Sequence, residues 1–179
     1  MPLSCDSPAA HAAALPGPAS SRADGIIATG VVGLDAMLGP CGFHRGSSAR
    51  ISGAAGTGKS MLAASIIDAA CRRGERCMAF MFEESGALII RNAHSIGLDL
   101  DMHVSSGRLR FEAARPSLFG VETHLARMHR DLDQFPQEVV VIDPAPTLCG
   151  PAGALQATLL RMIDLVKARH HGVLHHAAQ

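Results

Sequence analysis

A glycine-rich run between an apolar strand and an apolar helix limits what this chain can fold into more than any other feature. Residues 53–60 read GAAGTGKS, which fits the pattern G-x-x-x-x-G-K-[ST] in full. The preceding SARISG (48–53) is typical of a strand, and residues 59–72 place apolar side chains on one helix face. A strand, a tight glycine loop and a helix in this order predict an α/β domain that binds phosphate at the loop.

The spacing within the run has a direct physical reason. Glycines let successive backbone N–H groups turn inward around an anion, and the dipole of the following helix lies behind them. We expect Lys59 to reach the β- and γ-phosphates of a nucleoside triphosphate and the Ser60 hydroxyl to bind Mg²⁺. An ordinary glycine-rich turn is the alternative, but only two lysines occur in the chain and one falls at the motif position. The candidate nucleotide-binding residues are Gly53, Ala54, Ala55, Gly56, Thr57, Gly58, Lys59 and Ser60.

Carboxylates follow two further apolar strands. The segment EVVVID (138–143) ends in Asp143, which suits a Walker-B aspartate that holds the metal directly or through its water, although buried strands often end in Asp. The strand 75–82 is followed by Glu83 and Glu84, and a carboxylate there could accept a proton from attacking water. We assign Glu83 as the base. Glu84 is the more ambiguous catalytic candidate, since one of the pair could instead favour a helix N-terminus capped by Ser85.

Strand-like and helix-like segments alternate along the rest of the chain, which predicts a mostly parallel sheet with helices on both faces. Ligands of such sheets bind at the carboxyl ends of the strands, where the glycine loop lies. The expected helices are 33–38, 59–72, 86–96, 119–134 and 154–169, and the expected strands are 48–53, 75–82, 108–113, 138–143 and one that begins near GVLHH.

Composition excludes several classes of protein. The 179 residues suffice for one domain, and the formal net charge of zero argues against nucleic-acid binding through bulk charge. No apolar run is long enough to span a membrane. Five cysteines without a C-x-x-C pair favour reduced thiols and a cytoplasmic location. Residues 1–24 are rich in Ala, Pro and Ser, so we expect a disordered leader ahead of a single domain, 25–179.

The ordered motifs together resemble the KaiC proteins of the RecA-like ATPase superfamily, most closely the second KaiC domain. The resemblance runs from about Thr29 to about Val173 and is carried by TGVVGLDAMLGPCGFHRGSSARISGAAGTGKS, ACRRGERCMAFMFEES, IIRNAHSIGLDL, LRFEAARPSLFG and VVVIDP. It implies a RecA-like P-loop fold, Mg-ATP binding, ring assembly and ATPase activity, with Ser/Thr autokinase activity in the second domain. Glu83 and Glu84 match the family's paired catalytic glutamates, Asp143 its Walker-B aspartate, and Arg91 a family arginine of open role.

This chain also differs from the KaiC pattern near its C-terminus. KaiC proteins carry two such domains, and each continues past the strand that would begin at Val173, so we expect a domain that is incomplete at its C-terminus and lacks the family's phosphoacceptors. In RecA-like sheets that strand lies between the phosphate-loop strand and the Walker-B strand. His175 and His176 are unusual in a buried parallel strand. We therefore expect weak turnover and no autokinase activity from this chain alone.

Three functions remain open at this stage. The first is a KaiC-like ATPase, alone as a ring or with a full-length relative. The second is a nucleotide-binding or interaction module that does not hydrolyse ATP. A RecA-type DNA-dependent ATPase ranks third, because residues 144–156, which follow the Asp143 strand, contain no Lys or Arg.

Overall fold

The computed structural model describes residues 25–38, 42–54, 56–82, 84–113, 121–143, 161, 163, 164, 166 and 172–178. The expected leader lies outside these residues. The elements, in chain order, are β1 (Ile26–Ile27), α1 (Val32–Met37), β2 (Phe43–His44), β3 (Ser48–Gly53), α2 (Lys59–Arg72), β4 (Cys77–Met81), α3 (Gly86–His94), α4 (Leu100–Ser105), β5 (Leu109–Ala113), α5 (Val121–Gln134), β6 (Val139–Asp143) and β7 (Gly172–Ala178). Of the expected helix 154–169, the described residues 161, 163, 164 and 166 are helical.

Five strands form one parallel sheet in the order β3-β7-β6-β4-β5. The register pairs Gly53 with Ala178 and Met81 with Asp143, so the strands that precede the glycine loop and the glutamate pair end at one edge of the sheet. β7 lies between β3 and β6, which confirms the expected central position of the last strand. Only β7 therefore separates β3, which leads into the glycine loop, from β6, which ends at Asp143.

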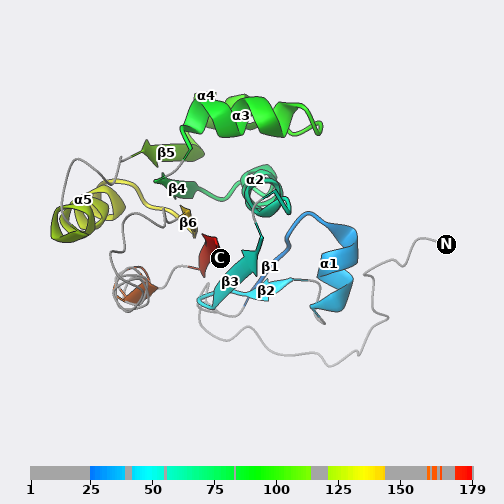
Figure 1. Cartoon of the computed structure of the whole chain (residues 1–179), viewed down its shortest axis with the longest axis horizontal. Coiled ribbons are helices and arrows are strands. Elements are labelled where there is room, and N and C mark those ends of the chain that lie inside the picture. Colours follow the sequence, from blue (N-terminus) through cyan, green and yellow to red (C-terminus); the bar gives the residue numbers. More distant parts are fainter. Residues whose placement is uncertain are drawn as a thin grey trace, which may run out of the picture.

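Helices cover both faces of this sheet, as expected (Figure 1). On one face α2, α3 and α4 pack over the side chains of Cys77, Ala79 and Met81 from β4. On the other face Met128 and Leu132 of α5, with Ile163 and Val166 of the partly described helix, pack against Met78, Phe80 and Phe82. Successive residues of β4 therefore point to opposite cores, which is why CMAFM is apolar at every position.

Local signals place the ends of the helices near the site. Ser85 is the N-cap of α3, and its hydroxyl accepts the Leu88 N–H at 3.3 Å, which confirms the predicted cap. Asp99 caps α4 in the same way, through the Met102 N–H at 3.2 Å. α2 ends where Gly74 adopts a φ of +88°, a conformation that glycine reaches without strain.

A small antiparallel sheet of two strands, β1 and β2, was not predicted from the sequence, and α1 lies between the two strands in the chain. Arg45 fastens it by an ion pair to Glu75, which also pairs with Arg73 at 3.1 Å. Across the described residues, none of the helices combines the length and the apolar character needed to cross a membrane.

Candidate functional site

The glycine loop joins the carboxyl end of β3 to the first turn of α2. Gly56 and Gly58 have φ values of +80° and +84°, so both occupy the left-handed region that glycine adopts without strain. The Thr57 hydroxyl donates to the Ala54 carbonyl at 2.8 Å and closes the loop from within. Gly56, Thr57 and Gly58 are exposed, and the loop therefore presents its backbone to solvent.

Lys59 lies over this loop. Its ammonium donates to the carbonyl oxygens of Gly53 and Ala54, at 2.8 Å in each case. These two bonds hold the cation at the carboxyl end of β3, beside the loop's backbone N–H groups. The ammonium is thus placed where an anion on the loop would meet it.

The N-terminus of α2 differs from those of α3 and α4. Gly58 is its N-cap and supplies no side-chain hydrogen bond, and the first turn of α2 contains no acidic residue. The four N-terminal N–H groups of a helix have no partner within the helix, and they carry the positive end of its dipole. A serine side chain accepts one of these N–H groups in α3, and an aspartate side chain does so in α4. The N–H groups of α2 are available to water or to a bound anion.

Ser60 and Asp143 come together at the edge of the sheet. Both line one small cavity of about 10 Å³, together with apolar side chains from α2, β4, α3, β5 and β6: Ala63, Ala64, Ile67, Met81, Ile89, Phe111 and Val141. Asp143 is 2% exposed, and its backbone carbonyl accepts the N–H of Phe82, the residue before the glutamate pair. The fold therefore unites a hydroxyl and a carboxylate that the sequence places far apart.

The apolar wall of this cavity was not predicted from the sequence. Phe111 on β5 packs so closely on Gly86, the first residue of α3, that a Cβ built there would lie 2.8 Å from the phenyl ring. This contact lies at the start of α3, which begins two residues after Glu84. No motif marks Phe111, because its role depends on β5 lying beside β4.

Of the two glutamates, the structure describes only Glu84. Glu83 lies outside the described residues. Glu84 is half-buried, and its Oε2 atom is buried without a hydrogen-bond partner among the residues described. It precedes the N-cap of α3, which suits the dipole role considered for one member of the pair. Arg91 is exposed on α3.

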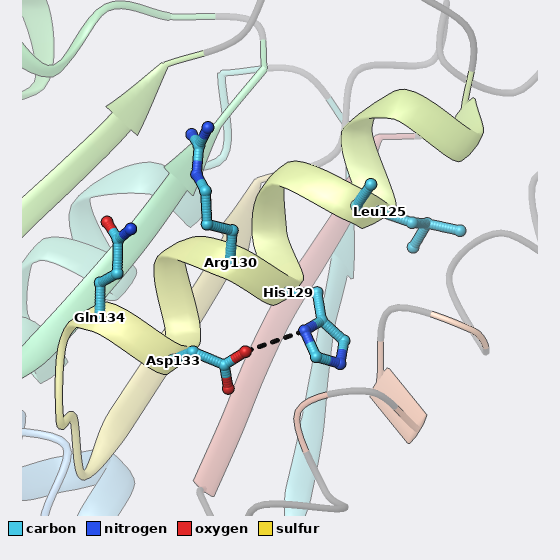
Figure 2. A pocket seen from close by; sticks show the side chains of 6 residues that line it. Leu125, His129, Arg130, Asp133 and Gln134 are labelled. Atoms are coloured by element: carbon cyan, nitrogen blue, oxygen red, sulfur yellow. Dashed lines mark ion pairs between the residues drawn. The ribbon is translucent and has the colours of Figure 1, made fainter.

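A larger pocket, about 610 Å³ in volume, lies along α5 (Figure 2). Its lining residues are Leu125, Ala126, His129, Arg130, Asp133 and Gln134, and His129 Nδ1 lies 3.0 Å from Asp133 Oδ2. α5 packs on the face of the sheet opposite α2. This pocket is therefore separate from the glycine loop and takes no part in the site there.

Comparison with known proteins is consistent with this geometry. A family model described as "ATPase: KaiC" matches residues 27–173. The chain is 42% identical over 146 residues to the "Circadian clock protein KaiC2" of Synechocystis sp. (strain ATCC 27184 / PCC 6803 / Kazusa), an alignment covering 80% of this chain and 26% of that protein.

Two further relatives are named "Circadian clock oscillator protein KaiC". The protein of Picosynechococcus sp. is 37% identical over 122 residues, which cover 68% of this chain and 23% of the relative. The protein of Parasynechococcus marenigrum is 38% identical over the same length, with 68% and 24% covered. The chain thus spans about a quarter of the length of the curated relatives it matches.

Proposed function

Because this chain belongs to the KaiC family of ATPases, we propose that its glycine loop binds Mg-ATP and that its carboxylates assist hydrolysis. One observation carries the proposal. Ser60 and Asp143 line the same cavity beside an α2 N-terminus that no side chain caps. That arrangement supports the proposal, because a nucleoside triphosphate requires oxygen ligands for its metal next to donors for its phosphates.

The residues present fit both groups. The exposed N–H groups of the loop and of the first turn of α2 suit phosphate oxygens, and Lys59 adds a positive charge. Magnesium prefers hard oxygen ligands and keeps several waters, so the Ser60 hydroxyl and the Asp143 carboxylate would suffice to hold it with the phosphates. When bound, the ion neutralises charge on the β- and γ-phosphates.

Each residue has a distinct role in the proposal. Lys59 binds the β/γ-phosphates, Ser60 and Asp143 hold the metal or its water, and Glu83 takes a proton from the attacking water. Glu84 is the second and more ambiguous catalytic candidate. Apolar side chains around Asp143 exclude water from the metal side of the site, which strengthens the attraction between the carboxylate and a cation.

The proposal leaves self-phosphorylation out for this chain alone. It includes association with a second copy, as a ring, or with a full-length relative. Support for association comes from α1, where Val32 is 78% exposed and Met37 is 84% exposed, beside the half-exposed Val31. In the proposal, Val32 and Met37 would contribute apolar area to such a contact.

Calorimetry tests the metal arrangement. ATP should bind the unchanged chain more tightly with Mg²⁺ than with a chelator. In Ser60→Ala and in Asp143→Asn, most of this increase in ATP affinity should be lost. Arg72→Ala, at the other end of α2, serves as the matched control and should behave like the unchanged chain. If both site variants keep the full magnesium effect, the two residues do not hold the metal and the proposal is wrong.

A further inference from the structure

Two buried thiols lie at the end of α2 remote from the glycine loop. Cys71 stands in the last turn of α2 and Cys77 is the first residue of β4. Both are free cysteines with 0% exposure. The proposed nucleotide chemistry uses neither, and nothing in the family resemblance assigns them a role.

Two backbone carbonyl groups place Cys71 and Cys77 next to each other. Cys71 Sγ lies 3.9 Å from the carbonyl oxygen of Arg108, and the same oxygen accepts the backbone N–H of Cys77 at 2.7 Å. Cys77 Sγ in turn lies 3.9 Å from the carbonyl oxygen of Ile67, one helical turn before Cys71. The Cys71 sulfur therefore lies beside a carbonyl that is bonded to Cys77, and the Cys77 sulfur lies beside a carbonyl one helical turn from Cys71.

The connecting turn holds this arrangement in place. The N–H of Gly74 donates to the Cys71 carbonyl at 3.0 Å, and the N–H of Glu75 donates to the Ala70 carbonyl at 3.1 Å. Arg45 and Arg73 both pair with Glu75. The chain thus reverses tightly between the two cysteines, and their approach is a fixed feature of the fold rather than a chance meeting of side chains.

The environment makes the two thiols unequal. The pKa of Cys71 is lowered, chiefly by hydrogen bonding with the Cys77 thiol and also by the positive charge of Arg108, against burial and the charges of Asp68 and Glu75. The pKa of Cys77 is raised well above its ordinary value, first by its bond with Cys71 and then by burial. Cys71 is therefore the thiol that ionises first and the better nucleophile of the two.

We propose that Cys71 and Cys77 are a redox-active pair that forms a reversible disulfide when a small peroxide oxidises the folded protein. The Cys71 thiolate attacks one oxygen of the peroxide, and the O–O bond breaks to leave a sulfenic acid on Cys71 and release hydroxide. Cys77 sulfur then attacks the oxidised sulfur, the S–O bond breaks, and the Cys77 proton leaves with the oxygen as water. The peroxide is reduced by two electrons and the thiol pair is oxidised by two.

The disulfide would fasten the last turn of α2 to the first residue of β4. A cross-link between neighbouring elements removes conformations from the unfolded chain, and seven residues form the closed loop, 71–77. For a domain of this size the thermal midpoint should rise by roughly 5–10 °C. The link lies far from Lys59, so ATP affinity should change less than about twofold.

Peptide mapping tests the proposal on the full chain. The folded protein is treated with hydrogen peroxide, alkylated and digested with trypsin without reduction. Cleavage after Lys59, Arg72, Arg76 and Arg91 should yield the peptide 60–72 joined to the peptide 77–91, and dithiothreitol should separate them. A parallel sample in urea should instead spread its cross-links over all five cysteines.

Single variants identify the attacking sulfur. Cys77→Ser should accumulate a sulfenic acid on Cys71, which dimedone labels. In Cys71→Ser, dimedone should label Cys77 at least fivefold less. The proposal is overturned if the folded chain forms the linked peptide no more than it forms pairs with Cys5, Cys41 or Cys149. Because mapping needs no nucleotide, its outcome is independent of whether the chain binds ATP.

Discussion

We expect Asp68→Ala to destabilise the fold, because Asp68 of α2 forms a buried hydrogen bond with α4. The Asp68 carboxylate is buried, with one oxygen 2.9 Å from His103 Nε2 on α4 and the other 2.7 Å from Arg72 Nε. His103 is 1% exposed, and its second ring nitrogen has no hydrogen-bond partner within the described part of the chain. Asp68 therefore links the helix that follows the glycine loop to α4 through a buried hydrogen bond.

The loss of unfolding free energy in Asp68→Ala is the sum of what His103 and Arg72 lose. Leaving the buried His103 Nε2 without an acceptor costs about 1–3 kcal/mol. The pair with Arg72 is worth only about 0.3–0.5 kcal/mol, because the arginine side chain is 59% exposed. We therefore expect Asp68→Ala to lower the free energy of unfolding by about 2–3 kcal/mol, which corresponds to roughly 4–12 °C in Tm.

Urea unfolding followed by circular dichroism measures the effect. Arg72→Ala is the matched control and should cost no more than about 0.5 kcal/mol. The double variant Asp68→Ala with His103→Leu should recover part of the loss, since no buried polar group is then left unpaired. If Asp68→Ala and Arg72→Ala destabilise the protein equally, the buried bond contributes nothing and the reasoning is refuted.

Three further predictions concern catalysis. Glu83→Gln should leave ATP affinity nearly unchanged and slow single-turnover hydrolysis by about 10²-fold or more, and a larger loss in Glu84→Gln would reverse the assignment within the pair. Gly86→Ala should disturb the close contact with Phe111 and slow hydrolysis without weakening ATP binding, and Phe111→Ala, which removes the phenyl ring, should restore part of the rate. The isolated chain should turn over slowly, because an arginine from a neighbour contributes about 10³–10⁵ in rate. Phosphate release by a purified hexamer as fast as that of a complete two-domain relative would contradict this.

Sequence patterns located the phosphate loop and its flanking elements well. The strand 48–53 and the helix 59–72 were predicted with the bounds that the structure has, because the motif fixes where one ends and the other begins. The strands of Asp143 and of the glutamate pair were also predicted, since a strand buried on both faces is apolar at every position.

The missed features depend on tertiary contacts. β1 and β2 have two residues each, too few for a periodic pattern, and their pairing places Gly42 where any Cβ would lie 2.3 Å from the Ile27 carbonyl oxygen. α4 was also missed, and the structure shows that Asp99 is its N-cap. The contact between Cys71 and Cys77 has no sequence signature, because it depends on the tight turn at Gly74.

Binding of Mg-ATP to the unchanged chain and to Lys59→Ala, compared by calorimetry, tests the central claim most directly. The ammonium that now bonds to the carbonyls of Gly53 and Ala54 supplies the charge for the β/γ-phosphates, a contact worth roughly 1.5–3 kcal/mol. We expect the variant to bind at least tenfold more weakly while its Tm without nucleotide stays within a few degrees. Equal affinity of both proteins for Mg-ATP would contradict the assignment of this loop as the nucleotide site.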